Sequence, residues 1–336
     1  DLDASTQKLL TAFTVLHSLT PDAVLTTRVY QSTADRGRIY LRGGGDPSLG
    51  VARIGALAEA TARRLALQKR TSVVLYVDRS IFPAPTMAPG WKASYRSDVQ
   101  PPQGLTLAGY RKPDGALAAG RAFVTALKAR GVTAKLATIT TTPATRTELA
   151  TTASAPISRL VASMLNASIN DYAEFLLRHA ARAGGRPATW QGAAAHEIAV
   201  LTAAHIPLGG VRIVDGTGLS RLARVTPAAL TGVVRLLWTT PADKAIVFSP
   251  NGIPRAGQSG TLAKRYHTPQ HRCAQGQVLA KTGTLDDAVA LAGVAQGADG
   301  RDRVFAFVEN GIVGKNTSVR LAVDTLATTV VGCALR

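Results

Sequence analysis

The sequence predicts an α/β (α+β) protein with two domains: a larger one built on an antiparallel sheet flanked by helices, and a smaller α/β domain inserted into it. The chain has 336 residues, of which 46% are hydrophobic. A chain of this length and hydrophobic content can bury a larger core than one domain usually needs. Short β-like runs alternate with Gly/Pro turns from residue 25 to 102, whereas the last third holds three strand-like runs in succession. We therefore assign residues 1–24 and 103–336 to the larger domain and residues 25–102 to the insertion.

Local patterns predict the elements of both domains. Apolar residues recur at helical spacing over residues 6–19, and Pro21 closes this mostly buried helix. The insertion is expected to contain three strands and one Ala-rich helix, at residues 26–30, 38–42, 72–78 and 51–67. Helices are expected next at residues 117–130, 157–166 and 171–183. Strand-like runs joined by turns then predict an antiparallel meander followed by a covering helix, at residues 277–281, 289–295, 303–309 and 317–330.

The chain is strongly basic, with a formal net charge of +18. Its lysines and arginines are scattered, and no stretch interleaves them with stacking aromatic residues, which argues against a nucleic-acid partner. A polyanionic cell wall or an anionic membrane surface would suit such a diffuse cationic surface, and so would solubility alone.

The two cysteines bear on the cellular compartment in which the protein works, because disulfides persist mainly in oxidising compartments. Cys273 and Cys333 fit either one disulfide in an oxidising compartment or two buried thiols, and we favour the disulfide because the motifs below point outside the cytoplasm. The sequence has no run of about twenty apolar residues that could cross a bilayer. Asp1 stands almost directly before the predicted catalytic helix. We therefore expect residues upstream of it, which leaves room for a secretion signal and an extracytoplasmic location.

A serine and a lysine stand three residues apart at the start of the first helix, as Ser5-Thr6-Gln7-Lys8. This spacing projects both side chains from one helix face. A lysine amine takes the proton of a serine hydroxyl only if burial or another cation lowers its pKa. An isolated match is more often a helix cap beside a solvated lysine, but Lys8 is the one lysine in the sequence with a serine three positions earlier.

A second pattern, Ser168-Ile169-Asn170, lies in the break between two predicted helices. Ser249-Pro250-Asn251 also matches Ser-x-Asn, but its proline and the following Gly252 indicate an ordinary turn. We therefore take Ser168 as the candidate, with a simple helix cap as its alternative.

The third pattern, Lys281-Thr282-Gly283-Thr284, is expected at the end of a strand. The lack of a side chain at Gly283 would let a substrate backbone approach, and an edge strand binds an extended peptide by pairing with it. The lysine and the threonine hydroxyls would hold a terminal carboxylate. For an isolated copy, a β-turn with an exposed lysine is the alternative.

The three patterns occur in the order Ser-x-x-Lys, Ser-x-Asn, Lys-Thr-Gly, which is the catalytic combination of penicillin-binding proteins and class A β-lactamases. Together with further segments they resemble the class C low-molecular-mass penicillin-binding proteins, the D-alanyl-D-alanine carboxypeptidase/endopeptidase family, with its transpeptidase-like fold. The segments that carry this resemblance are residues 1–12, 44–47, 99–102, 215–221 and 260–262.

The resemblance implies a serine D,D-peptidase that acts on peptidoglycan peptides ending in D-Ala-D-Ala and is acylated by β-lactam antibiotics. Ser5 would be the acylated nucleophile and Lys8 its general base. Ser168 and Asn170 would relay a proton and hold the substrate amide.

The same resemblance implies the contacts that bind the substrate. Lys281 and Thr282 would hold the terminal carboxylate, and the backbone amides of Ser5 and Thr284 would form the oxyanion hole. In the family, an aspartate of the inserted domain and an arginine recognise the free end of a diaminopimelate-type side chain. The residues of that pocket would be Asp98, Arg221, Tyr95 and Leu219, with a surface ion pair or loop charge as the alternative for the first two.

Asp3 and Ile169 depart from the family pattern, in which a proline is common two residues before the nucleophile. A serine β-lactamase is the main alternative function, but no glutamate begins the Glu-x-x-Leu-Asn element with which class A enzymes deacylate. A non-catalytic wall-binding protein is a second alternative, against which the intact set of reacting residues argues. No metal or cofactor is expected, since His196-Glu197 lacks the second histidine of a zinc-protease helix at Val200.

Overall fold

The structure, a computed structural model, describes residues 1–333. The chain forms two compact units. The first consists of Asp1–Pro21, Ala88–Ala93 and Ser158–Arg336, and the second of Asp22–Met87 and Ser94–Ile157.

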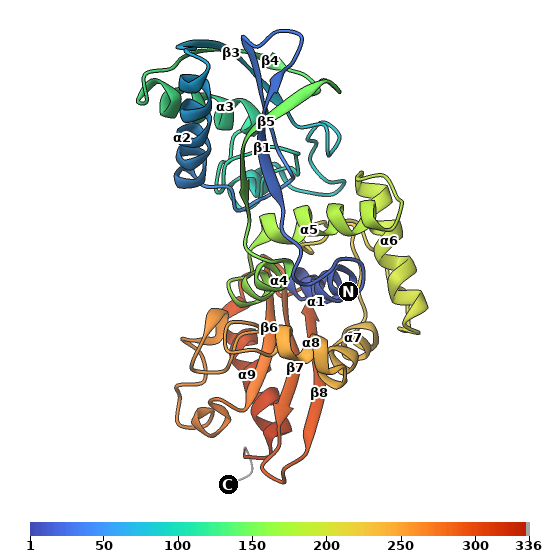
Figure 1. Cartoon of the computed structure of the whole chain (residues 1–336). Helices are drawn as coiled ribbons and strands as arrows, with labels where there is room; N and C mark the ends of the chain where they lie inside the picture. Colours follow the sequence, from blue (N-terminus) through green and yellow to red (C-terminus); the bar gives the residue numbers. More distant parts are fainter. Residues whose placement is uncertain (334–336) are drawn as a thin grey trace. The chain divides into compact units, whose positions relative to one another are not determined.

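The second unit is a five-stranded sheet with two helices. Its elements are β1 (Thr26–Ser32), β2 (Arg38–Arg42), α2 (Val51–Leu67), β3 (Ser72–Asp78), α3 (Gly115–Lys128), β4 (Thr133–Ile139) and β5 (Arg146–Ala153). The strand order is β4-β3-β2-β1-β5, with β1 antiparallel to both of its neighbours and the other pairs parallel. Helices α2 and α3 pack against each other beside this sheet (Figure 1).

Apolar side chains of the strands and helices form one core in this unit. Ile39 and Leu41 of β2, Leu75 of β3, and Ile54 and Phe123 of the two helices are all fully buried there. Strands β4 and β5 lie beyond the predicted end of the insertion at residue 102, yet they pair with β3 and β1. The second unit is therefore longer than the predicted insertion and continues to Ile157.

The first unit is a three-stranded sheet surrounded by helices. Its elements are the 3-10 helix η1 (Ala4–Thr6), α1 (Gln7–Leu16), α5 (Asn170–Ala183), α6 (Trp190–Ala203), α7 (Pro227–Thr239), α8 (Pro241–Val247), η3 (Gly260–Leu262), η4 (Arg272–Ala274), β6 (Val278–Leu285), β7 (Ala288–Gln296), β8 (Asp302–Asn310) and α9 (Asn316–Val331). Helix α4 (Ile157–Asn166) begins at the boundary of the two units, and η2 (Ala93–Ser97) spans another point where the chain passes between them. The predicted antiparallel meander β6-β7-β8 is confirmed.

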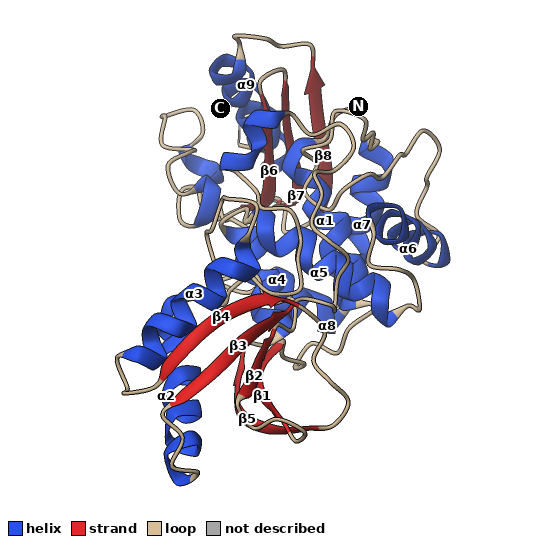
Figure 2. Ribbon diagram, turned by 90° about the horizontal axis from the view of Figure 1, so that it is seen from above, coloured by secondary structure: helices blue, strands red, loops and turns tan. Residues whose placement is uncertain are grey.

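Both faces of the central strand β7 are buried. Because side chains alternate along a strand, one face presents Val289 and Leu291, which join an apolar cluster with Val323 and Ala327 of α9. The alternate residues, among them Ala290, face η1. Figure 2 shows α9 and α7 on opposite sides of the three strands. The face that carries η1 is the one on which the predicted motifs gather.

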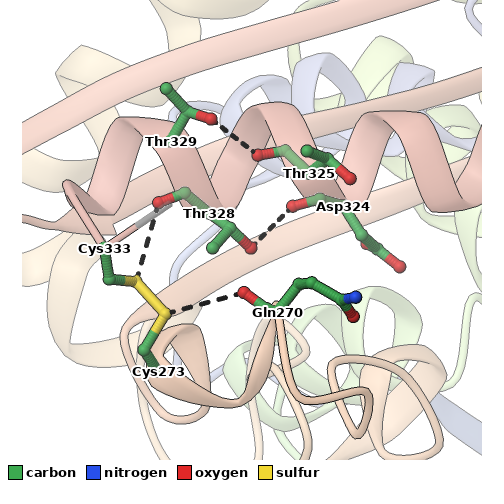
Figure 3. Close-up of a disulfide and its surroundings, with 7 residues drawn as sticks. All are labelled: Gln270, Cys273, Asp324, Thr325, Thr328, Thr329 and Cys333. Atoms are coloured by element: carbon green, nitrogen blue, oxygen red, sulfur yellow. Dashed lines mark hydrogen bonds between the residues drawn. A yellow bond between two sulfur atoms is a disulfide. The ribbon is translucent and has the colours of Figure 1, made fainter. Parts of the chain in front are cut away.

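A disulfide joins Cys273 of η4 to Cys333, just after α9, which confirms the predicted pairing. The bridge closes a separation of 60 residues and lies beside Gln270 and Thr328 (Figure 3). It fixes the end of α9 against the segment that leads into β6. Within residues 1–333, no helix is both long and apolar enough to span a membrane.

Candidate active site

Ser5 and Lys8 lie at the junction of η1 and α1, and their side chains meet. Lys8 Nζ donates to Ser5 Oγ at 2.9 Å and to the carbonyl oxygen of Thr217 at 3.1 Å. The Lys8 side chain is completely buried, whereas Ser5 is half-buried. The amine therefore reaches the serine hydroxyl from inside the protein.

Burial lowers the pKa of Lys8 from its ordinary value to about 8. Removing an ammonium group from water disfavours its charged form, while the carboxylates of Asp215, Glu174 and Asp3 act in the opposite direction. With this pKa, about a tenth of the amine is neutral at pH 7, far more than for an ordinary lysine. Such an amine can accept a proton from Ser5.

The backbone just before Ser5 is held in an unusual conformation. Ala4 has a φ of 48°, in the left-handed region that few residues with a side chain adopt. Gly218 packs directly against it, because a Cβ at Gly218 would lie 1.8 Å from the Ala4 carbonyl oxygen. Strained backbone of this kind persists where the surroundings over-determine it, often at functional sites. Here the conformation of Ala4 fixes the direction of the backbone at Ser5.

Ser168 and Lys281 form a second hydroxyl–amine pair. Ser168 occupies the break between α4 and α5 with a φ of 57°, and Lys281 Nζ donates to its Oγ at 2.9 Å. Lys281 also donates to the carbonyl oxygen of Thr282 at 2.8 Å. Burial, together with the positive charge of Lys8, holds the pKa of Lys281 well below its usual value. The two lysines thus lie within electrostatic reach of each other, and both pairs belong to one site.

The Lys-Thr-Gly motif lies inside β6 and not at its end as predicted, because the strand continues to Leu285 before it turns. In the described sheet β6 is one of the two outer strands. Its first half pairs with the segment before η3, through Ala256 N to Val278 O and Ala280 N to Pro254 O. Lys281 follows directly after Ala280, which makes the last of these bonds. The motif therefore begins where this pairing ends, and a peptide could add to the strand there.

The three residues that follow Lys281 are placed differently from one another. Thr282 Oγ1 lies 2.7 Å from Thr261 Oγ1, and Thr284 is exposed. A Cβ at Gly283 would lie 2.6 Å from the Asp3 carbonyl oxygen. The glycine therefore leaves room for the backbone at Asp3, just before η1, which is a reason for a glycine here that the sequence did not reveal. Asn170 is the first residue of α5 and is half-buried two positions after Ser168.

The residues of the predicted side-chain pocket fall in different units. Arg221 lies in the first unit and donates hydrogen bonds to both carboxylate oxygens of Asp287, at 2.7 and 2.5 Å. Leu219, two residues earlier in the chain, is buried. The guanidinium lowers the pKa of the Asp287 carboxyl. Tyr95 and Asp98 belong to the second unit, where the Asp98 amide donates to the Tyr95 carbonyl at 2.9 Å. A joint role of Asp98 and Arg221 stays a prediction.

The sequence interpretation missed a set of buried carboxyls behind the two lysines. Asp3, Glu174, Glu197 and Asp215 are each at most 1% exposed. Glu174 offered one signal, since it stands one helical turn after Asn170 on α5 and so shares a face with it. Among residues 1–333, no three His, Cys, Asp or Glu side chains are grouped so that they could hold a metal ion.

Comparison with known proteins agrees with this geometry. The sequence profile of the D-Ala-D-Ala carboxypeptidase 3 (S13) family matches residues 2–111 and 100–330. Carboxypeptidase DacB of Mycolicibacterium smegmatis is 34% identical, over 98% of this chain and 75% of its own length. The crystal structure of penicillin binding protein 4 (dacB) from Haemophilus influenzae has a TM-score of 0.81 at 20% identity, covering 98% of this chain and 90% of that one. Its complex with a novel β-lactam has a TM-score of 0.76 at 22% identity, covering 98% and 89%. These structures share the fold.

Proposed function

The chain belongs to the D-Ala-D-Ala carboxypeptidase 3 (S13) family and is a serine-type D-Ala-D-Ala carboxypeptidase, and we propose that it works through an acyl-enzyme on Ser5. The observation that carries this proposal is the 2.9 Å contact between Lys8 Nζ and Ser5 Oγ, made by a fully buried lysine. Family membership favours the peptidase over the serine β-lactamase that the same three motifs allow.

In the first half of the proposed reaction, the neutral amine of Lys8 accepts the hydroxyl proton of Ser5. The Ser5 oxygen attacks the carbonyl carbon of the D-Ala-D-Ala peptide bond, and the negative charge that develops on the carbonyl oxygen is stabilised by the backbone amides of Ser5 and Thr284. The tetrahedral intermediate collapses when its C–N bond breaks. The proton passes to the nitrogen of the departing D-alanine, with Ser168 as the relay.

Lys281 supports this relay because it holds Ser168 Oγ at 2.9 Å. We propose that Lys281 and Thr282 also bind the terminal carboxylate, that Gly283 lets the substrate approach β6, and that Asn170 holds the substrate amide. In the second half of the reaction a water attacks the ester carbonyl carbon and gives a proton to the amine of Lys8. The bond between that carbon and Ser5 Oγ then breaks, Lys8 returns the proton to Ser5 Oγ, and the shortened peptide leaves with a free carboxylate.

The substrate is proposed to be a peptidoglycan peptide ending in D-Ala-D-Ala, with β-lactams as acylating inhibitors. The Haemophilus influenzae protein that shares the fold has been crystallised with a β-lactam. Such a substrate places the enzyme outside the cytoplasm, and a net charge of +18 suits a polyanionic wall. We further propose that Leu219 and Arg221 of the first unit receive the side chain of a diaminopimelate-type residue; for Tyr95 and Asp98 of the second unit that role stays a prediction.

Incubation with labelled penicillin, followed by intact-mass analysis, tests the proposal. Wild type should gain the full mass of the antibiotic, because ring opening releases no leaving group, and Ser5→Ala should gain none. Rapid loss of the adduct with turnover of penicillin would indicate a β-lactamase, and no adduct on wild type would indicate a non-catalytic wall-binding protein. Release of D-alanine from a D-Ala-D-Ala peptide, measured in parallel, connects the adduct to the peptidase reaction.

A further inference from the structure

The amine of Lys8 is aimed by a backbone carbonyl as well as by Ser5. Its Nζ donates to the Thr217 oxygen at 3.1 Å, so the orientation of the peptide at Thr217 fixes one of its hydrogen bonds. Thr217 belongs to the turn formed by residues 215–218, whose Gly218 packs against Ala4. The same turn therefore governs both partners of the proposed proton transfer.

The side chain of Glu174 on α5 holds the backbone of this turn. Glu174 Oε1 accepts hydrogen bonds from the backbone amides of Gly216 and Thr217, both at 3.0 Å. Glu174 is completely buried, and it stands on α5 one turn after Asn170. Two consecutive N–H groups that donate to one carboxyl oxygen fix both ends of the intervening peptide.

Further contacts of the turn come from α1, from within the turn, and from Trp91, whose indole Nε1 donates to Asp215 Oδ2. Thr11 Oγ1 donates to the Gly216 carbonyl at 2.9 Å, and Asp215 Oδ1 accepts from the Gly218 amide at 2.9 Å. A Cβ at Gly216 would lie 3.0 Å from the Ala173 carbonyl oxygen, so the turn rests closely on α5. Glu174 thus links the helix that begins at the Ser-x-Asn motif to the carbonyl that orients Lys8.

We propose that Glu174 is a positioning residue for the general base: its carboxyl group holds the Gly216–Thr217 backbone so that the Thr217 carbonyl directs the Lys8 amine at Ser5. This inference rests on the proposed function, because it assigns a role in the same proton transfer. Glu174 makes no contact with the reacting atoms and acts through Thr217.

The charge of Glu174 also acts on Lys8. Burial, and after it the charge of Asp215, raises the pKa of Glu174, whereas Arg178 of α5, a side-chain hydrogen bond with Thr217 and the charge of Lys8 lower it, and the net pKa is about 8. The other charged groups of this cluster are Asp3 before α1 and Glu197 on α6. An ionised Glu174 favours the ammonium form of Lys8. Removing the charge while keeping the oxygen should therefore lower the pKa of Lys8.

Two substitutions separate these contributions. Glu174→Gln keeps an oxygen that can accept both backbone bonds but removes the charge, whereas Glu174→Ala removes both. At high pH, we expect penicillin to acylate Glu174→Gln at a rate within about tenfold of wild type. The acid limb of its pH–rate profile, where the acylation rate falls as Lys8 is protonated, should lie at a pH lower by about half a unit or more. We expect Glu174→Ala to lose about 100-fold at every pH, because a displacement of about 1 Å at a reacting group has that cost.

Glu197→Gln is the matched control, because Glu197 is an equally buried glutamate whose carboxyl oxygens accept hydrogen bonds from Gln7 Nε2 and Thr11 Oγ1. It should change thermal stability while leaving the position of the acid limb unchanged. Equal losses in both Glu174 variants, with an unchanged pH profile and a fall in melting temperature, would reduce Glu174 to a structural residue and overturn the proposal. Wild-type kinetics in Glu174→Ala would overturn it as well.

A second readout does not depend on activity. The NMR titration of the Lys8 side chain, assigned through its loss in Lys8→Met, should move to lower pH in Glu174→Gln, and the Lys8 resonance should shift in Glu174→Ala as the Thr217 contact is lost. If wild type forms no penicillin adduct, the proposed function fails, and this titration still decides whether Glu174 positions Lys8. A Lys8 titration and resonance unchanged in both variants contradicts the inference.

Discussion

Lys281 Nζ donates to Ser168 Oγ at 2.9 Å, across 113 residues of sequence. This bond holds a serine whose backbone already lies in the left-handed region, and it joins an edge strand to the break between two helices. The serine is therefore fixed in position before any substrate arrives, as a proton relay requires.

Removal of the Ser168 hydroxyl should slow acylation without unfolding the protein. We expect Ser168→Ala to react with penicillin ~100-fold or more slowly than wild type, in the range that proton transfer contributes to catalysis. Ser249→Ala is the matched control, because this serine also precedes an asparagine by two positions but donates to the Ile246 carbonyl. The measurement is the second-order rate of adduct formation. Equal rates in the two variants would remove Ser168 from the mechanism.

The pKa of Lys8 sets the pH dependence of acylation. The folded-state pKa of about 8 is lower than the ordinary lysine value, so Lys8 is mostly protonated below pH 8 and cannot then accept the Ser5 proton. The acylation rate should rise with pH through about 8 and reach a plateau above it, with a rate at pH 6 ~100-fold below the plateau. Stopped-flow kinetics with a chromogenic β-lactam measure this profile. A rate that stays constant from pH 6 to pH 9 would exclude Lys8 as the base.

Gly218 should tolerate no side chain. Its φ is 77°, and a Cβ would lie 1.8 Å from the Ala4 carbonyl oxygen, so Gly218→Ala must displace the backbone that precedes Ser5. We expect a loss of stability above about 3 kcal/mol and a loss of acylation in the protein that still folds. Gly311→Ala is the control, since Gly311 has a φ of 73° with nothing within 4 Å, and it should cost only about 1 kcal/mol. Urea denaturation compares the two, and equal costs would show that the Ala4 contact is unimportant.

Elements with strong local periodicity were predictable from the sequence. The helix at residues 51–67 and the strands at 38–42 and 72–78 coincide with α2, β2 and β3, because apolar residues repeat there at the spacing of the element and turn residues bound them. The meander of the first unit was predictable for the same reason.

Strands β4 and β5 were not predictable in this way. β5 is rich in threonine and lies at one edge of its sheet, and β4 lies at the other with no buried position. β5 joins the sheet by pairing with β1, and Thr26 of β1 is the register partner of Ala153 of β5. Such pairing depends on contacts between distant parts of the chain, which leave little periodic signal in the strand itself.

Spacing and order alone predicted the four side chains that form the two hydroxyl–amine pairs, whereas they did not predict the residues behind them. A glutamate in a helix is expected to face solvent, because charged residues are rarely buried. Glu174 is buried because two amides of the turn at residues 215–218 satisfy one of its oxygens, and that turn lies about forty residues further along the chain. Only the folded structure brings them together.

The disulfide between Cys273 and Cys333 should contribute stability but not activity. It closes a loop of 60 residues, for which the entropy of the unfolded chain predicts on the order of 4 kcal/mol. The bridge lies at the end of α9, which packs on the face of the sheet that carries Ala280, whereas the adjacent Lys281 points to the other face. The double variant Cys273→Ser/Cys333→Ser should therefore unfold at lower urea concentration and still be acylated at the wild-type rate. Loss of acylation in the folded variant would contradict this separation.

The ion pair of Arg221 with Asp287 should compete with binding of a carboxylate on the substrate. Both side chains are about one quarter exposed, and the guanidinium can bind two carboxylate oxygens at a time in this geometry. If Arg221 receives the free carboxylate of a diaminopimelate-type side chain, Asp287→Asn should release it and lower KM for that peptide by about threefold to tenfold. Arg221→Ala should raise KM for the same peptide by a similar factor.

Asp286→Asn is the control, because the neighbouring Asp286 pairs with Lys92 on the surface. The measurement is kcat/KM for two D-Ala-D-Ala peptides, one with diaminopimelate and one with acetylated lysine at the same position. Only the first should respond to Asp287→Asn and Arg221→Ala, and penicillin acylation should be unchanged in both variants. If both peptides respond equally, Arg221 stabilises the turn between β6 and β7 and has no part in recognising the side chain.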